Sequence, residues 1–368
     1  MFDRRLLQNF DWILLLLLIL IAGISVANLY SATAAIRDAG GSQILVKQIY
    51  WYLIGFSVLL LMTTFDYHLL ERLAFLGYLL TLGLLVLVLL IGDVHSGSQR
   101  WLEFGGVRFQ VSELAKVVLV LTLAKYFSEQ GMDRASRLRD LWQPFLLIAF
   151  PCVLVGIEPD LGTALLLAIV SFSIILFTKV RRKSLLILFA AFLSAAPLMW
   201  FFLFKEYQQR RILSFLSPNA DPLGASYHVN QSKIAIGSGL FWGRGYLEGT
   251  QTRLHFLPEQ HTDFVFSVLA EEWGFIGSVI LVLLFLILIF WGLNIAQGCR
   301  EPFGTIMAVG ITSMFFWQVI INIAMTMGLM PVVGVPLPLI SYGGSSVLTT
   351  AIGIGLLMNI SMRRFMLE

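Results

Sequence analysis

Ten apolar stretches, each close to the length that crosses a bilayer, divide this chain of 368 residues. A hydrocarbon core about 30 Å thick takes roughly 20 apolar residues per helix. The stretches are residues 12–31, 47–64, 74–92, 110–128, 143–158, 161–178, 184–204, 274–296, 305–330 and 346–362. Only 13% of the residues are charged, against roughly 25% in soluble domains. The sequence therefore predicts an all-α polytopic membrane protein of ten transmembrane helices, forming a single domain over residues 1–368.

Lysine and arginine gather in the short loops on one side of this predicted topology. The first stretch lacks a small-residue cleavage site, so it is interpreted as a retained helix and not as a signal peptide. Because short cytoplasmic loops are enriched in basic residues, both termini are expected in the cytoplasm. The basic residues on that side are Arg4, Arg5, Arg134, Arg137, Arg139, Lys179, Arg181, Arg182, Lys183, Arg300, Arg363 and Arg364.

The cysteines and the charge balance argue against several classes of function. Cys152 lies within the fifth stretch and Cys299 at the end of the eighth, so no disulfide framework is expected. The net charge is +3, and no basic run outside the cytoplasmic loops suggests nucleic acid as a partner. The sequence also shows no Cys/His cluster for zinc and no convincing Ser-His-Asp order.

A long segment, residues 205–273, separates the seventh and eighth stretches and faces outward in this topology. Connections of that size are commonly functional in compact proteins. A solvated basic face is the competing interpretation for each of its cations. These cations are Lys205, Arg210, Arg211, Lys233, Arg244 and Arg253.

The end of this segment, Leu257–Phe264, places acids and a histidine directly beside an apolar span. Ionisable groups at a membrane boundary usually serve function. If the loop is strand-like, His261 and Asp263 face one cavity, whereas in a helix they diverge. Alternatively, Asp263 only caps the following helix and His261 only makes a structural hydrogen bond.

Three other outward segments carry polar residues. Glu113 and Lys116 are three positions apart on a predicted helix, so they share a face and can pair there. Asp160 lies in an acidic turn, where capping of the next helix is an alternative role. Residues 331–346 contain three prolines and end in Gly-Gly-Ser-Ser. Such broken backbone is tolerated at membrane depth where it lines a wet cavity, and its glycine-rich end is either an anion site or a plain hinge.

These motifs, in this order, resemble the SEDS family (shape, elongation, division and sporulation) of peptidoglycan polymerases. The resemblance covers essentially the whole chain and rests on Ser96–Trp101, Gln110–Lys116, Pro159–Thr163, Leu257–Phe264 and Ser341–Gly344. Three further segments resemble the elongation branch of the family more than its division branch. They are Asp221–Gly224, Gln231–Gly239 and Gly249–Gln251.

The resemblance implies a glycosyltransferase that joins lipid II units on the outer face of the bacterial cytoplasmic membrane during cell elongation. The family's essential acid matches Asp263, and its second important acid matches Asp160. Its basic residue at the start of the second helix matches Lys47. Other matched motif positions are Arg100, Trp101, Glu113 and Lys116.

The chemistry of lipid II assigns roles to these residue types. Inversion at the donor sugar requires one general base, which we expect to be Asp263, with Asp160, Glu113, Lys116, His261 and Glu259 in support. Cations and polar groups must hold the pyrophosphate and the sugars. The expected binding residues are Lys47, Arg100, Trp101, Arg108, Gln110, Arg210, Arg211, Lys233, Ser341 and Gly343.

The sequence leaves several alternatives open. A lipid II flippase and a non-catalytic scaffold of the elongation machinery are the rival functions, although no inverted repeat is evident. No cofactor is firmly expected, while Asp160 could hold a divalent cation such as Mg²⁺ or Mn²⁺. The resemblance further implies a class B penicillin-binding protein, a transpeptidase, as partner beside other membrane proteins of the elongation complex.

Overall fold

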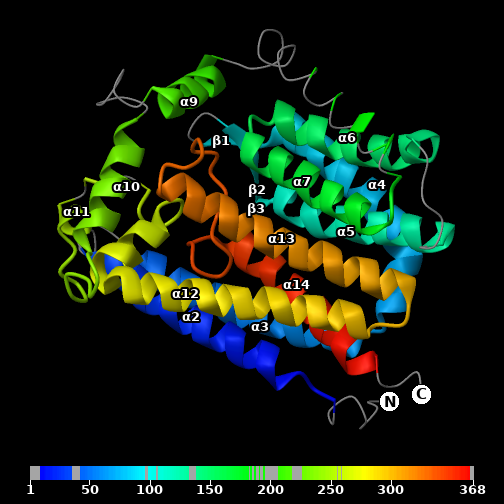
Figure 1. Ribbon diagram of the computed structural model, residues 1–368, viewed down its shortest axis with the longest axis horizontal. Helices are drawn as coiled ribbons and strands as arrows, with labels where there is room; N and C mark the ends of the chain where they lie inside the picture. Colours follow the sequence, from blue (N-terminus) through cyan, green and yellow to red (C-terminus); the bar gives the residue numbers. More distant parts are fainter. Residues whose placement is uncertain are drawn as a thin grey trace.

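The computed structural model describes most of the chain. It covers residues 9–34, 42–95, 98–104, 107–131, 138–181, 183–184, 186–187, 190, 194, 206–217, 226–254, 256–257 and 259–364. Long helices form the body of the molecule (Figure 1): α2 (Trp12–Ala32), α3 (Ser42–Thr64), α4 (Tyr67–Ile91), α5 (Val111–Gln130), α6 (Trp142–Ile157), α7 (Leu161–Phe177), α12 (Val265–Gly298), α13 (Pro302–Thr326) and α14 (Gly344–Arg363). The fold class predicted from the sequence, an all-α membrane protein, is confirmed.

These helices coincide with nine of the ten predicted spans. In the described part of the chain, α2, α3, α4, α12, α13 and α14 are long and apolar enough to cross a membrane, and α6 and α7 are shorter apolar helices. The seventh stretch, 184–204, falls mostly outside the described residues, so the count of ten stays a prediction. The helix that contains the eighth span starts at Val265, ahead of residue 274, because α12 continues across a break at Gly274, whose φ is +66°.

At one end of the bundle, the carboxylate of Asp11 links three helices through hydrogen bonds. Asp11 caps α2 by accepting from the backbone N–H of Leu14 at 3.2 Å. Its side chain also accepts from Trp291 Nε1 of α12 at 2.9 Å and from Ser361 Oγ of α14 at 2.8 Å. Asp11 thus joins the first, eighth and last of the predicted spans at the end where the chain starts and finishes.

Helix α14 lies inside the bundle against α3. A Cβ built on Gly344 would lie 2.1 Å from Cε2 of Trp51, so the indole packs directly on the glycine backbone. Farther along, a Cβ on Gly355 would lie 2.8 Å from Cβ of Met62. Small residues allow this close approach of helices in a membrane, where the hydrophobic effect does not drive helices together because lipid is as apolar as the side chains.

The opposite end of the bundle is built from irregular elements (Figure 1). A small antiparallel sheet has the order β1 (Asp93–His95), β2 (Ser98–Phe104), β3 (Val107–Gln110) and leads straight into α5. Residues 331–343 follow α13 without regular structure, as the three prolines predict. Their carbonyl groups find partners on neighbouring helices: Asn322 Nδ2 donates to Val335 O at 2.8 Å, and Ser25 Oγ donates to Ile340 O at 2.9 Å.

The long segment before α12 contains more helix than the sequence analysis predicted. It includes α9 (Glu206–Leu216), α10 (Tyr227–Ser238) and α11 (Thr250–Arg253). Helix α10 docks through Ser232, whose Oγ lies 2.6 Å from Ser267 Oγ and 2.6 Å from Thr326 O. This contact is made by polar residues of distant segments, which explains why apolar periodicity alone does not reveal it.

Candidate functional site

The site is organised around Asp160, at the start of α7. Its Oδ1 accepts from the backbone N–H of Thr163 at 3.2 Å, so the capping role considered for it is real. Its Oδ2 also accepts from Gln110 Nε2 at 2.9 Å and lies 3.3 Å from Ser112 Oγ. Asp160 therefore caps α7 and at the same time fixes the start of α5.

Gln110 extends this network to α14. Its backbone N–H donates to Ser345 Oγ at 3.0 Å, and its side chain reaches both Ser112 and Asp160. The predicted binding residue Gln110 is therefore a structural link between three helix starts. The Gln110–Lys116 and Pro159–Thr163 motifs meet in space, although about 50 residues separate them.

Arg100 of β2 is the cation nearest to this network. Its Nη1 lies 3.6 Å from Asp160 Oδ1, which is a loose ion pair, and its side chain is 28% exposed. Its Nε is buried, and no described residue accepts a hydrogen bond from it. The guanidinium is thus anchored at one corner and keeps donors for another acceptor.

Asp263 lies in a turn that the irregular segment 331–343 holds in place. The Oγ of Ser341 donates to Thr262 O at 2.7 Å, the N–H of Tyr342 donates to His261 O at 2.9 Å, and Asn322 Nδ2 donates to Asp263 O at 3.1 Å. The backbone beside the acid is therefore fixed, whereas no described residue donates a hydrogen bond to its carboxyl group. A Cβ on Gly334 would lie 3.5 Å from Asp263 Oδ2, so the carboxyl faces this glycine.

Charges from four separate segments act on the Asp263 carboxyl. Its pKa is raised to about 6, chiefly by burial, and Glu259 and Asp160 contribute to the rise. Arg100 and Arg211 oppose this rise by favouring the charged form. The structure therefore brings Asp263 into the electrostatic field of two arginines that are far from it in sequence.

Arg211 projects from α9 toward the same region. Its Nη1 donates to Val332 O at 3.2 Å, which ties α9 to the irregular segment. It also acts on His228 of α10, whose ring stacks on Phe264 with centroids 6.3 Å apart. Burial lowers the pKa of His228, Glu259 raises it and Arg211 lowers it, so His228 shares the two charged neighbours of Asp263.

His261 and Glu259 lie in the same turn as Asp263. The strand-like loop that would aim His261 and Asp263 into one cavity is not observed, because the backbone turns at residues 259–264. The His261 ring lies 6.0 Å from the Tyr342 ring, and burial lowers its pKa, while Glu259 opposes the change. Glu259 is exposed and accepts from Thr262 Oγ1 at 3.0 Å.

Several other predicted cations lie apart from Asp263. Arg210 pairs with Glu206 at 3.7 Å, and both side chains are largely exposed, which is the solvated face considered as the alternative. Lys233 lies against the backbone of Gly328 after α13. Arg108 pairs across the sheet with Glu103 at 3.5 Å. Burial raises the pKa of Tyr342 and Arg108 opposes the rise, while Lys47 is exposed on α3. Trp101 is partly exposed opposite Gln110 in the sheet.

Ser341 and Gly343 use their polar groups within the protein. The hydroxyl of Ser341 accepts from the N–H of Leu337 at 2.8 Å in addition to its bond to Thr262 O, and the residue is buried. The N–H of Gly343 donates to Gln48 Oε1 at 3.2 Å. The expected anion site at this N–H group is therefore already filled by an amide side chain.

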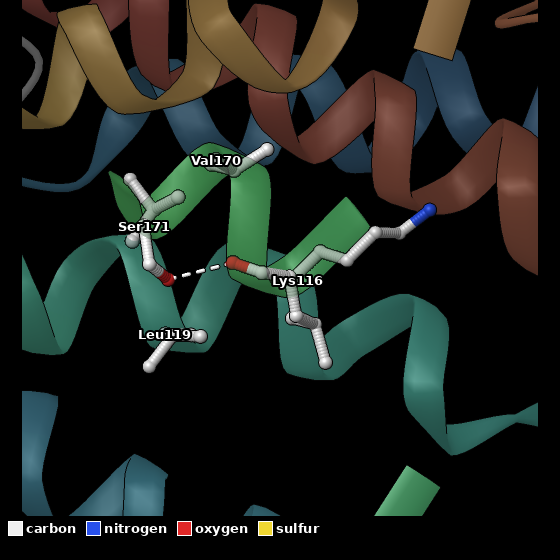
Figure 2. A pocket seen from close by; sticks show the side chains of 6 residues that line it. Lys116, Leu119, Val170 and Ser171 are labelled. Carbon is white, nitrogen blue, oxygen red and sulfur yellow. Dashed lines mark hydrogen bonds between the residues drawn. The ribbon is translucent and has the colours of Figure 1, made fainter. Parts of the chain in front are cut away.

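Glu113 and Lys116 form the buried pair that their spacing predicts. Lys116 Nζ lies 2.6 Å from Glu113 Oε1, and both side chains are almost fully buried. The stem of Lys116 lines a narrow cavity between α5 and α7, and Figure 2 shows its ammonium directed away from Ser171. Because this cavity is too narrow to admit a water molecule, it is not a sugar site.

Glu158 is a buried acid to which the sequence analysis gave no role. It is fully buried, and neither carboxyl oxygen has a partner among the described residues. Its pKa is raised to about 8, chiefly by burial, with Asp160 contributing to the rise and Arg100 opposing it. An acid directly after an apolar span was the available signal, whereas His228 could not be found because its contact, Phe264, is distant in the chain.

A divalent cation was considered at Asp160. Among the described residues, no group of three or more His, Cys, Asp or Glu side chains is placed to hold a metal ion. The Asp160 oxygens are also occupied by hydrogen bonds to α5 and α7. A divalent cation at Asp160 therefore stays a prediction.

The chain is similar to known membrane proteins in sequence and in fold. A family model described as a cell cycle protein of the FtsW, RodA and SpoVE type matches residues 8–365. The peptidoglycan glycosyltransferase MrdB of Escherichia coli K12 is 41% identical over 356 residues, covering 96% of this chain and 94% of that protein. A chain from a peptidoglycan synthase complex that coordinates polymerization and crosslinking is 33% identical, with a TM-score of 0.83, covering 97% and 98%. The rod shape determining protein RodA of Thermus thermophilus is 30% identical, with a TM-score of 0.71 and the same coverage.

Proposed function

The chain belongs to the SEDS family and is a RodA-like peptidoglycan glycosyltransferase of the membrane, and we propose that it polymerises lipid II with Asp263 as general base. The observation that supports this most is the Asp263 carboxyl in the field of Arg100 and Arg211 at one end of the bundle. A base and two cations are the groups that transfer from a pyrophosphate requires. The relatives are named glycosyltransferases, so the flippase and scaffold alternatives are not retained.

The proposed transfer is a single displacement. The 4-hydroxyl oxygen of the acceptor N-acetylglucosamine bonds to the donor anomeric carbon as Asp263 takes its proton. The bond from that carbon to the pyrophosphate oxygen breaks, and the electron pair leaves with the pyrophosphate. Because the donor link is α and the product link β, one inversion with one base is sufficient.

The pKa of Asp263 suits this role. A general base works best when its pKa is close to the working pH while it stays ionised. Burial raises the Asp263 pKa from its ordinary value to about 6, so near neutral pH the carboxylate is charged and more basic than an exposed aspartate. A helix cap alone would not require this environment.

Arg100 and Arg211 are proposed to bind the leaving pyrophosphate. Arg100 keeps a buried Nε that no described residue engages, and its link to Asp160 is long at 3.6 Å. Guanidinium groups match phosphate oxygens through pairs of parallel hydrogen bonds. Asp160 then acts as a positioning residue, since it holds Arg100 from behind while it caps α7.

The orientation and the partner belong to the same proposal. Basic residues predict that the Asp11 end faces the cytoplasm, which places Asp263 on the outer side, where lipid II is polymerised. A class B penicillin-binding protein is proposed as partner because a similar chain comes from a complex that couples polymerization to crosslinking. Both terminal regions of the bundle, at Asp11 and at Ser361, then lie on the cytoplasmic side.

The test is replacement of Asp263 by asparagine in purified protein with labelled lipid II. Loss of a positioned base should reduce polymerisation about 10²–10⁴-fold. The fold should survive and even gain stability near pH 7.5, by about 1–3 kcal/mol, because the folded-state pKa is raised and the wild type therefore loses stability as pH rises through about 6.

Asp11→Asn is the matched control, since it makes the same chemical change at the other end of the bundle. It should keep polymerisation, because Asp11 lies outside the proposed site, while stability should fall since the amide offers one oxygen to the donors that use two in the wild type. Glycan formation by a folded Asp263→Asn variant at the wild-type rate would disprove the base assignment.

A further inference from the structure

The break in α12 is closed by another part of the chain. A break in a membrane helix frees backbone groups that need partners, because lipid supplies none. Here the loop between α10 and α11 supplies them on both sides of Gly274. The bonds run from Arg244 N to Glu271 O at 3.0 Å, Gly245 N to Glu272 O at 3.1 Å, Phe275 N to Leu240 O at 3.0 Å and Ile276 N to Phe241 O at 3.3 Å.

Glycines make this fit so close that the loop is locked to the helix. A Cβ on Gly239 would lie 2.0 Å from Ala270 O, and a Cβ on Gly243 would lie 2.0 Å from Glu272 O. Gly243 also has a φ of +83°, which disfavours any residue with a side chain. The loop backbone therefore has a fixed place beside the break in α12.

The outward side of this loop is strongly apolar. Leu240 is 79% exposed, Phe241 54%, Trp242 78% and, on α12 itself, Phe275 57%. We call these four residues the apolar knob. The rings of Phe241 and Phe275 stack with centroids 5.7 Å apart, so the knob is one surface and not four scattered side chains. Contiguous exposed apolar surface marks a site of contact with lipid or protein.

The knob continues the lipid-facing surface of α12. Below Phe275 the helix exposes a row of large apolar side chains that ends near Leu293. At about 1.5 Å per residue, the stretch from Phe275 to Leu293 is about 27 Å long, close to the roughly 30 Å of a hydrocarbon core. Phe275 therefore lies at the edge of the hydrocarbon, and the knob lies beside it. The row consists of Ile280, Leu283, Leu286, Ile287, Phe290 and Leu293.

We propose that the apolar knob inserts into the bilayer leaflet on the Asp263 side and anchors the α10–α11 segment there. Tryptophan favours this depth, since its ring is apolar and its N–H can reach water or headgroups. The occupant of the surface is thus lipid, in the region where acyl chains meet headgroups. Tyr246 ties the same loop to α2, donating to Ala27 O at 3.1 Å, so the anchor is coupled to two membrane helices.

Spin labelling in liposomes tests the proposal. Cys152 and Cys299 are replaced by alanine, and a nitroxide is attached to Trp242→Cys in protein reconstituted alone into phosphatidylethanolamine and phosphatidylglycerol. Collision with oxygen, which concentrates in lipid, is compared with collision with a water-soluble nickel chelate. Glu248→Cys is the matched control, because Glu248 lies in the same loop and is exposed and polar.

The label at position 242 should collide several times more often with oxygen than with the chelate, and the label at 248 should show the reverse. Equal access of the chelate to both labels would overturn the proposal and leave the knob for a protein partner. Protection of position 242 from both reagents would also overturn it, by indicating a second copy of the chain. If Trp242→Cys fails to fold, Leu240→Cys, on the same knob, gives the same reading.

Discussion

The two ends of the helix bundle differ in whether their charged side chains have hydrogen-bond partners. At one end, the carboxylate of Asp11 accepts hydrogen bonds from the backbone N–H of Leu14, the indole of Trp291 and the hydroxyl of Ser361. At the other end, the carboxyl of Asp263 accepts no hydrogen bond from a described residue, and Arg100 keeps a buried Nε without a partner there. The Asp11 carboxylate is satisfied internally, while Asp263 and Arg100 have capacity for a substrate.

This difference separates residues that hold the fold from residues that do chemistry. A buried polar group without a partner costs stability, so a protein keeps one chiefly where a ligand or a reaction uses it. In the Glu113–Lys116 pair inside α5, the charges meet each other at 2.6 Å, although Glu113 Oε2 has no hydrogen-bond partner among the described residues. Substitutions in closed groups should therefore change stability, and those in open groups should change activity.

Breaking the buried pair should have the largest effect on stability. Lys116→Met leaves the Glu113 carboxylate alone in an apolar helix, which should cost about 3–5 kcal/mol in unfolding free energy. Thermal unfolding in detergent measures the loss. The double variant Glu113→Leu/Lys116→Met should recover most of it, because neither charge remains. A single variant as stable as the wild type would place Lys116 among the open groups.

Exchange of Arg100 for lysine should affect activity next most strongly. Lysine keeps the charge but loses the forked donors, so polymerisation of lipid II should fall about 10²-fold with an unchanged thermal midpoint. Arg363→Lys is the matched control at the closed end, where the guanidinium bonds to Asn359 Oδ1 and Phe65 O. Equal loss in both variants would remove the distinction between the two ends.

The last effect, at Glu158, should appear in the pH dependence of stability below about pH 8. Its folded-state pKa of about 8 lies above the ordinary value. Protonated Glu158 therefore stabilises the folded protein at low pH, and this contribution is lost as the pH rises through about 8. The loss should approach about 1.4 kcal/mol per pH unit between the ordinary value of 4.5 and about 8, and it should level off above that point. Glu158→Gln carries no titrating group and should flatten this part of the stability profile. An unchanged slope would show that Glu158 ionises freely.

The membrane body and the motifs could be predicted because they are local in sequence. Apolar stretches mark nine of the helices seen, and the spacing of Glu113 and Lys116 predicts their pair. Three prolines forbid a continuous helix in residues 331–343, and the structure confirms it. Each of these inferences rests on a short window of the chain, where helix geometry or backbone sterics decides the outcome.

The rest depends on contacts between distant segments. The loop that closes the break at Gly274 lies some 30 residues before it, and no single window shows that Leu240 and Phe241 will satisfy Phe275 and Ile276. The use of Ser341 and Gly343 inside the protein likewise depends on Thr262 and Gln48. The sequence pattern grouped these polar residues in one outward region. It could not show that Arg210 and Lys233 lie apart from Asp263, or that Ser341 and Gly343 form their hydrogen bonds within the protein.

The pH dependence of polymerisation tests the role of Asp263 most directly. With lipid II as substrate, kcat/KM should be level above about pH 7 and fall about tenfold per pH unit below about 6, because protonation removes the base. Thermal unfolding over the same range must show that the protein stays folded. A rate that stays constant from about pH 5 to pH 8 in folded protein would contradict general-base catalysis by a carboxylate with this pKa.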